Sequence, residues 1–294
     1  MQREDWLAGQ FQQNRGHLRG VAYRMLGSAS EADDAVQEAW LRLSRSEADS
    51  IENFGGWLTT VVSRVCLDML RSRKSRREEA METQAAEPAA ERGVGTDPES
   101  EAIMADAVGV ALLVVLNRLS PAERLAFVLH DLFAVSFEEI GGIMDRSATA
   151  ARQLASRARR RVQGSPATER EDRAKQRETV GRLLAALRAG DVSGMVEVLD
   201  PDLVVRIDEA SMQPGGQREI RGAENWARQA VAFAKMARFV QPVLVDGVPG
   251  VLLAPQGRLR RVLRFTFADG KIAAIEIIGD PEVLKEIELA VLEV

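Results

Sequence analysis

The spacing of apolar residues changes near residue 164, and this change constrains the fold of the chain more than any other feature. Before it, apolar residues recur every three or four positions, as at Leu18, Val21 and Met25, which is the period of a helix that buries one face. After it, short runs rich in Val, Ile and Leu are separated by turns, as in strands. We therefore expect a multidomain protein with two all-α domains followed by an α+β domain, since 294 residues exceed what one core usually organises.

The first helical block extends from about Trp6 into a basic run at 71–77. Gly27 is expected to end one helix and Ser30 to cap the next, whose first turn is acidic. A polar loop then precedes a third helix that begins near Trp57. The block is thus predicted to contain three helices, the last with a basic end.

The second helical block contains three serine-capped helix starts, at Ser120, Ser136 and Ser147. The first two serines have a glutamate three residues later, which is the signature of a capping box. The last helix is basic and is expected to end near Val162. Two short helices joined by a tight turn, the second one basic, predict a helix-turn-helix.

The last part of the chain combines helices with strands. A helix is predicted over about 174–189, and the turn at Ala268-Asp269-Gly270-Lys271 indicates a hairpin. A mostly antiparallel sheet is expected. Its predicted strands are Leu203–Ile207, Val240–Val245, Gly250–Ala254, Arg260–Phe267 and Ile272–Ile278.

Charge is unevenly distributed along the chain, although its net value is only -5. Residues 71–77 and 147–163 each contain five basic and no acidic side chains, whereas 80–105 contains six acidic side chains against Arg92. Basic faces on an acidic chain predict DNA contacts at chosen places rather than general coating of nucleic acid. Residues 79–100 are rich in Ala, Glu, Gly and Pro without periodicity, which predicts a flexible linker.

The single cysteine, Cys66, excludes an intrachain disulfide and lies among apolar residues, so we expect a core thiol in a reducing cytoplasm. The acidic start Met1–Trp6 does not resemble a secretory signal. No apolar run approaches the ~20 residues that span a bilayer.

Both helical blocks resemble parts of the extracytoplasmic-function (ECF) RNA polymerase sigma factors, in that family's order. The first block resembles sigma region 2, a helical bundle, and the second resembles sigma region 4, a helix-turn-helix. The tail resembles the SnoaL-like domain, a cystatin-like cone, that is fused to the sigma-J-like or group-41 subset. The segments that carry the resemblance in the two blocks are Ala22–Gly27, Glu31–Leu41, Trp57–Arg64, Leu119–Arg124 and Ser147–Arg161.

The resemblance divides the chain into region 2 at 1–78, the linker at 79–100, region 4 at 101–164 and the SnoaL-like domain at 170–294. Three motifs of the subset are altered. The Trp-Leu-Pro-Glu-Pro linker motif is reduced to Ala86-Glu87-Pro88, the Asp-Gly-Gly-Gly loop is Gln213-Pro214-Gly215-Gly216, and the closing Asn-Pro-Asp-Lys-Leu is Gly279–Leu284. All three are motifs that the subset associates with regulation by the tail.

The resemblance implies a sigma factor that binds core RNA polymerase through the β′ clamp and β flap and directs promoter-specific initiation. The tail is expected to modulate this activity by intramolecular contact with regions 2 and 4. Residues implied in core polymerase binding are Asp33, Asp34, Gln37, Glu38 and Leu41. Those implied at the −10 element are Asn53, Phe54, Trp57, Arg64, Asp68, Arg71, Arg73 and Lys74. Those implied at the −35 element are Ser147, Thr149, Arg152, Gln153, Ser156, Arg157 and Arg160.

Two other classes of function stay open at this point: a ligand-sensing helix-turn-helix repressor, and a SnoaL-like cyclase or isomerase. The only histidines, His17 and His130, lie outside the tail, which excludes an imidazole base there. Asp208 and Glu209 form a carboxylate pair or a solvated strand end. There is no Cys/His metal spacing, no Walker loop and no GxGxxG, so we expect neither a cofactor nor an enzyme.

Overall fold

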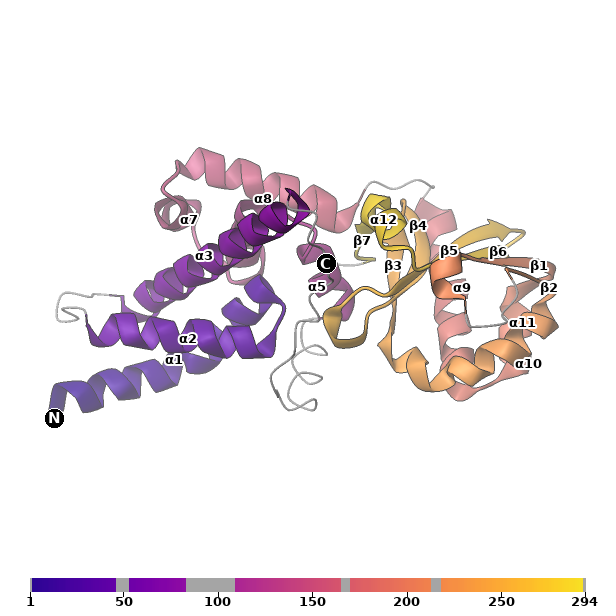
Figure 1. Ribbon diagram of the computed structural model, residues 1–294, viewed down its shortest axis with the longest axis horizontal. Coiled ribbons are helices and arrows are strands. Elements are labelled where there is room, and N and C mark those ends of the chain that lie inside the picture. Colours follow the sequence, from indigo (N-terminus) through magenta and orange to yellow (C-terminus); the bar gives the residue numbers. More distant parts are fainter. Residues whose placement is uncertain (1, 46–52, 83–108, 165–169, 213–217, 293–294) are drawn as a thin grey trace. The chain divides into compact units, whose positions relative to one another are not determined.

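The computed structural model describes residues 2–45, 53–82, 109–164, 170–212 and 218–292 (Figure 1). The chain forms two compact units. Unit 1 comprises Met1–Val108 and Leu116–Arg159, and unit 2 comprises Gly109–Val115 and Arg160–Val294. The expected fold class, helical modules followed by an α+β domain, is confirmed.

The first three helices of unit 1 are α1 (Gln2–Leu26), α2 (Ala29–Ser44) and α3 (Phe54–Glu82), and each packs against the other two (Figure 1). Their core side chains, such as Leu18, Met25, Leu43 and Leu58, are completely buried. These helices follow from the apolar spacing in the sequence, which places one buried stripe on each.

The ends of these helices differ in part from the sequence predictions. Gly27 has a φ of 74° and ends α1 as expected. The cap of α2 is Ser28, whose Oγ accepts from the N–H of Glu31, so the prediction of Ser30 was wrong. Similarly, α3 begins before Trp57, because Asn53 Oδ1 accepts from the Gly56 N–H at 2.9 Å. The linker was predicted over 79–100, but α3 continues to Glu82, so its predicted start was wrong. The rest of the predicted linker lies outside the described residues.

The second set of helices comprises α5 (Val110–Leu116), α6 (Pro121–Phe127), the π turn η2 (Val128–Leu132), α7 (Phe137–Met144) and α8 (Ala148–Gln163). Capping boxes at Ser120 and Ser136 start α6 and α7 as predicted, and Ser147 Oγ accepts from the Ala150 N–H at the start of α8. Asp145 ends α7 in the left-handed conformation. The helix-turn-helix is therefore confirmed as α7 and α8.

Unit 2 contains a seven-stranded sheet in the order β2-β1-β6-β5-β4-β3-β7. Within the described residues, β1 and β6 pair in parallel and the other pairs are antiparallel. The strands are β1 (Leu199–Ile207), β2 (Glu219–Arg221), β3 (Val240–Val245), β4 (Val248–Leu253), β5 (Arg261–Ala268), β6 (Lys271–Ile278) and β7 (Leu289–Ala290). The helical segments are α9 (Arg170–Ala189), α10 (Val192–Val198), η3 (Glu209–Ser211), α11 (Ala223–Ala230), η4 (Val231–Phe239), η5 (Pro255–Gly257) and α12 (Pro281–Glu286).

One face of this sheet packs against α9, α10 and α11. Val205, Ile275 and Phe265 are neighbours across β1, β6 and β5 and are all buried. They share one apolar cluster with Leu183 of α9 and Trp226 of α11, among others. The tail therefore has a large core of its own, which the short apolar runs in its sequence supply.

Candidate nucleic-acid interface

The outer face of α2 is acidic. Asp34, Gln37 and Leu41 are exposed, and Leu41 is 40% exposed although it is apolar. Glu38 is half-buried and accepts from Arg42 Nε at 3.0 Å, one turn later on the helix. Four of the five residues implied in polymerase binding thus lie along one accessible side of the helix.

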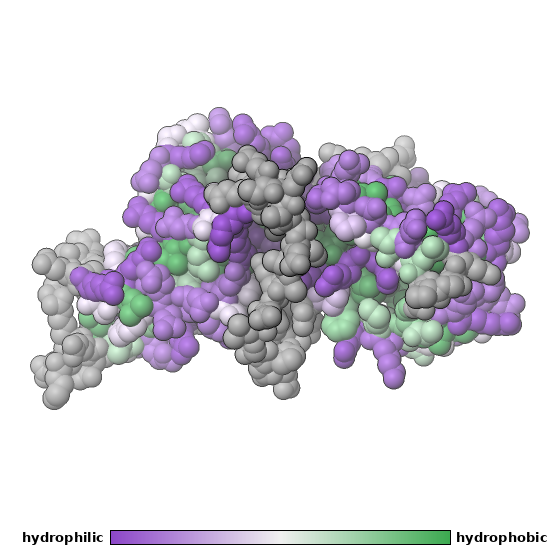
Figure 2. All heavy atoms as spheres, viewed as in Figure 1, coloured by the Kyte–Doolittle hydropathy of each residue, from purple (hydrophilic) through white to green (hydrophobic). Residues whose placement is uncertain are grey.

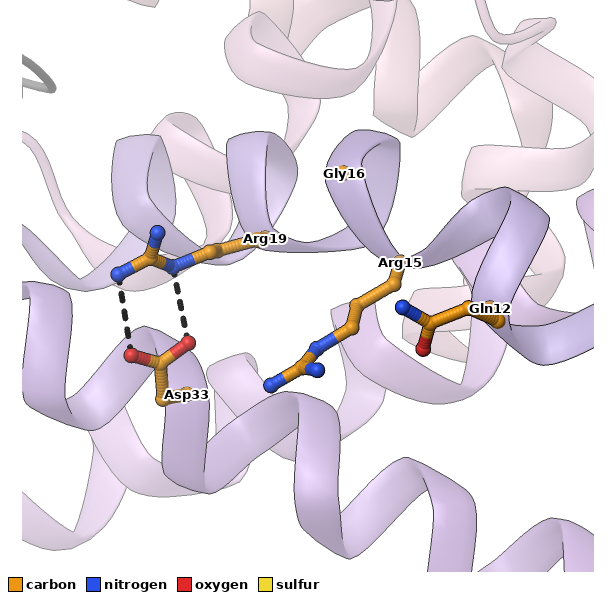
Figure 3. Close-up of a pocket in the computed structure, with 5 residues that line it drawn as sticks. All are labelled: Gln12, Arg15, Gly16, Arg19 and Asp33. Atoms are coloured by element: carbon orange, nitrogen blue, oxygen red, sulfur yellow. Dashed lines mark hydrogen bonds and ion pairs between the residues drawn. The ribbon is translucent and has the colours of Figure 1, made fainter. Parts of the chain in front are cut away.

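The fifth, Asp33, is engaged within the molecule. Its carboxylate forms a two-bond ion pair with Arg19 of α1, with Nε–Oδ1 at 2.8 Å and Nη2–Oδ2 at 3.1 Å. The pair borders a shallow pocket lined by Gln12, Arg15 and Gly16 (Figure 3). Arg15 extends from α1 beside the pair and has no hydrogen bond or ion pair among the described residues. These basic side chains next to the acidic stripe were not predicted from the sequence.

The residues implied at the −10 element lie along α3 and have different environments. Asn53 caps the helix, and the ring of Phe54 contacts Trp6 edge-on with centroids 5.6 Å apart. Trp57 is half-buried, and Asp68 and Arg71 are exposed. The side chain of Lys74, like the loop at 46–52, lies outside the described residues.

Two arginines of α3 are already bound to other parts of unit 1. Arg64 donates to the Gly142 carbonyl of α7 at 2.9 Å. Arg73 pairs with Glu31 of α2 and also donates to the Leu26 carbonyl at the end of α1. Arg64 thus links the two helical blocks of unit 1, whereas Arg73 links α3 to α1 and α2 within the first block.

Arg124 of α6 makes the most buried of these contacts. Its side chain is only 3% exposed and donates from Nε and Nη2 to the Arg24 carbonyl, at 3.0 and 2.8 Å, and from Nη1 to Asn117 Oδ1 at 2.6 Å. The carbonyls of the last turn of α1 have no partner inside the helix, and the negative end of its dipole favours a cation. Burial, and secondarily the charge of Arg73, lowers the pKa of Arg124 to about 9.

An aromatic contact also links α1 to Phe133, the residue that follows η2. The imidazole of His17 meets the ring of Phe133 edge-on at 5.1 Å between centroids, and the Arg24 guanidinium lies 5.2 Å from the centre of that ring. His17 Nε2 also lies 3.3 Å from Thr59 Oγ1. Desolvation by burial lowers the pKa of His17.

The basic helix α8 buries a stripe of alanines, Ala151, Ala155 and Ala158. The side chains of Thr149, Arg152, Gln153, Arg157 and Arg160 are exposed, and Ser156 is half-buried. On the face seen in Figure 2, most residues of both units are hydrophilic. The arginine and glutamine side chains on the exposed side of α8 are of the kind that read base edges.

Two arginines of this helix have partners in the same module. Arg159 pairs with Asp131 of η2 at 2.6 Å between Nη2 and Oδ1. The Arg152 guanidinium lies 5.2 Å from the centre of the Phe137 ring, and that ring stacks on His130. The stack was not predicted, because it joins three residues from separate turns of the chain.

In unit 2, Asp208 is fully engaged by backbone groups. Its carboxylate accepts from the N–H groups of Gly279 and Asp280 at 2.7 Å each and of Ser211 at 2.8 Å. Partial burial raises the pKa of Asp208, but the Ser211 hydroxyl and the backbone N–H groups of Gly279, Asp280 and Ser211 outweigh it, and the net shift is downward. Glu209 is exposed and pairs with Arg218. The two carboxylates therefore have separate structural partners.

No group of metal-ligating side chains occurs among the described residues. Cys66 is completely buried, and desolvation raises the pKa of its thiol to about 12, so it is not a nucleophile. In the part of the chain that the structure describes, no helix has the length and apolar content needed to cross a membrane.

Two sigma-70 families match the helical modules: region 2 matches residues 10–76 and region 4 matches residues 109–162. The chain is 39% identical to the ECF RNA polymerase sigma factor SigJ of Mycobacterium tuberculosis, over 93% of this chain and 91% of that protein. It is 33% identical to the probable ECF RNA polymerase sigma factor SigI of the same species, over 97% of both chains. The crystal structure of SigJ covers 94% of this chain at 34% identity, with a TM-score of 0.44.

Proposed function

The chain belongs to the ECF RNA polymerase sigma factors and directs transcription initiation with that enzyme, and we propose which of its surfaces bind core polymerase and which bind promoter DNA. The observation that carries the proposal is the opposite charge of two exposed helical faces in unit 1. The face of α2 is acidic and that of α8 is basic. Complementary charge sets the rate and register of association with a partner.

The acidic face of α2 binds the β′ clamp of core polymerase. Asp34, Gln37, Glu38 and Leu41 provide two acids, an amide and an apolar contact on one side of the helix. Asp33 acts through Arg19, since their ion pair fixes α2 against α1. Arg15 adds a positive charge beside this acidic face, so we expect the clamp surface to carry an acidic side chain next to its basic side chains. Region 4 binds the β flap.

Promoter DNA is bound by α3 and α8. At the −10 element, Asn53, Phe54 and Trp57 hold an unstacked base, because base capture needs polar and aromatic groups. Arg64, Arg71, Arg73 and Lys74 provide cations for the phosphates of the strand. Asp68 lies on the same helix and contacts a base rather than a phosphate. At the −35 element, Arg152, Gln153, Ser156 and Arg157 read base edges. Ser147, Thr149 and Arg160 contact phosphates.

The contacts inside unit 1 hold regions 2 and 4 in a resting arrangement. Arg64 cannot donate to the Gly142 carbonyl and to a phosphate with the same N–H group. Engagement with polymerase and DNA therefore breaks the contacts that Arg64 and Arg124 make between the two helical blocks. Binding then selects the open arrangement by its differential affinity. The protein acts in the cytoplasm, where polymerase and DNA meet, and carries out no catalysis of its own.

The tail domain modulates this opening through region 4. The segment Gly109–Val115, which the region 4 family match includes, packs within unit 2. Unit 2 also contains the end of α8, where the Val291 N–H donates to the Val162 carbonyl at 2.8 Å. A tail that shares both ends of region 4 stays at high effective concentration beside it, so modest contacts suffice to bias the helix-turn-helix.

Run-off transcription with purified core polymerase and a randomised promoter library tests the sigma role. For the tail, a protease site placed between α8 and α9, at residues 165–169, allows the chain to be cut without deleting any described helix or strand. We expect cutting to change transcription at least threefold while the uncut variant behaves as the natural chain does. Equal transcription before and after complete cutting would contradict covalent regulation by the tail.

A further inference from the structure

We infer that Phe137, supported by His130, positions Arg152 and thereby determines specificity at one base pair of the −35 element. The inference deepens the proposed −35 function and rests on the proposed role of Arg152. It assigns two positioning residues, His130 of η2 and Phe137 of α7, which are half-buried whereas Arg152 is exposed.

The three side chains form a continuous stack. The rings of His130 and Phe137 have centroids 3.8 Å apart and an interplanar angle of 28°. Arg152 Cζ lies 5.2 Å from the centre of the Phe137 ring, within the range of a cation–π contact. Both rings are half-buried, whereas Arg152 is exposed. The guanidinium therefore has a fixed aromatic support and an accessible edge.

The support itself is held by the backbone. His130 Nδ1 lies 3.0 Å from the Val135 carbonyl. Since a carbonyl only accepts, Nδ1 carries the proton and the orientation of the ring is set. Phe137 is the first residue of α7, directly after the capping box of Ser136 and Glu139. The His130 ring cannot rotate without breaking its bond to the Val135 carbonyl, and the capping box fixes the backbone from which the Phe137 ring extends.

This arrangement matters because bidentate reading of guanine needs a guanidinium held in one plane. An unsupported arginine samples many rotamers, and stacking restricts them while leaving N–H groups free for the base edge. Arg157, one and a half turns later on α8, has no ring contact among the described residues. Of these two arginines, Arg152 is therefore the one whose direction the fold determines, and Phe137 is the residue that determines it.

The test uses the full chain with core polymerase and a library randomised over the −35 element. We expect Arg152→Ala to relax preference at one position about tenfold, the lower range for a lost bidentate contact. Phe137→Leu is expected to relax the same position about threefold to fivefold, and Phe137→Tyr to retain it. The double variant should be no worse than Arg152→Ala alone, because both changes remove one function. Phe267→Leu, which removes a half-buried ring from unit 2, is the matched control.

A second measurement follows the stack directly. The δ-protons of Arg152 should show a ring-current shift in the NMR spectrum that is lost in Phe137→Leu and kept in Phe137→Tyr. Unchanged base preference in Phe137→Leu, or an equal loss of affinity for all sequences, overturns the inference even if Arg152→Ala behaves as expected. If Arg152→Ala relaxes no position, the reading role of Arg152 fails and the inference with it, while a normal ring-current shift would show that the stack had formed.

Discussion

The two units use buried polar side chains differently, as Arg124 and Asp208 show. Arg124 is a buried cation that binds the carbonyl end of α1, and it joins two helical modules that each have an apolar core. Asp208 is a half-buried anion that binds three N–H groups, and it joins the ends of β1 and β6 inside one domain with one core. The first contact lies between modules and the second lies within a module.

This difference indicates which joint can open. When a polar joint opens, water replaces the lost hydrogen bonds and the guanidinium regains its hydration, so the net cost is small. Opening an apolar core exposes surface at about 25 cal/mol per Å². We therefore expect the modules of unit 1 to separate during function while the domain of unit 2 moves as a whole.

The largest expected effect tests whether the exposed charges of unit 1 serve a partner. Asp34→Arg with Glu38→Arg places like charges opposite a basic clamp surface, and we expect affinity for core polymerase to fall about a hundredfold or more. Titration of labelled core polymerase measures this loss. Because both residues are accessible on α2, circular dichroism should be unchanged.

The matched control reverses two exposed acids of unit 2, Glu197→Arg with Glu224→Arg, which pair only with exposed arginines of the same unit. The comparison between units predicts unchanged affinity for polymerase. A similar loss in both double variants would mean that net charge, and not the face of α2, governs binding.

The next effect concerns the joint within unit 2. Asp208→Ala leaves three N–H groups without an acceptor, and we expect the tail domain to lose about 3 kcal/mol of stability. Urea unfolding followed by hydrogen exchange in β1 and β6 measures the loss. Glu209→Ala, next in sequence but exposed, should change stability by less than about 0.5 kcal/mol.

A smaller effect is expected at the joint between the modules. Arg124→Met removes a buried cation while keeping its volume, so we expect stability to change by no more than about 1 kcal/mol. Opening should nevertheless become easier. Amide exchange at the end of α1 is predicted to quicken by up to about fivefold, equivalent to ~1 kcal/mol. Arg228→Met, an exposed arginine on α11, is the control, and unchanged exchange in Arg124→Met would show that this residue does not hold the joint.

Much of the fold could be predicted because its signals are local. The capping boxes at Ser120 and Ser136 and the turn at Asp269-Gly270, with φ values of 50° and 77°, depend on residues within one turn of each other. The strand β2, the helix α11 and the hairpin at Asp246-Gly247 were missed. β2 has only three residues and is identified by pairing with β1 rather than by its own pattern.

For the site, the sequence predicted which helix faces are exposed but not the individual contacts of the side chains. Helical period placed Asp34 and Arg157 on exposed faces, because an amphipathic pattern states which side is outside. It could not show that Asp33 pairs with Arg19, that Arg64 binds the Gly142 carbonyl, or that Phe137 supports Arg152. Each of these contacts joins residues far apart in the sequence. A weak signal existed for Arg124, which is a charged residue on the apolar side of α6 among buried neighbours.

The smallest effect is a pH dependence that separates the two joints. Hydrogen bonds hold the pKa of Asp208 in the folded tail below its ordinary value. A carboxyl whose pKa is depressed by folding contributes stability that is fully present above its unfolded pKa, about 4, and is lost as the pH falls through its folded pKa. Acidification from pH 6 to pH 3 should thus destabilise the tail of the natural chain, in part through Asp208.

Asp208→Asn removes that titration, so the stability difference between the variant and the natural chain should shrink as the pH falls below about 4. Arg124 stays charged throughout this range, since even its lowered pKa is about 9. Hydrogen exchange at the end of α1 should therefore show no acid-induced change that depends on Arg124, and Arg124→Met should shift it by the same factor at pH 6 and pH 4. A constant difference between Asp208→Asn and the natural chain across the acid range would show that Asp208 does not stabilise the tail as an anion, and the contrast between the two joints would then rest on their location alone.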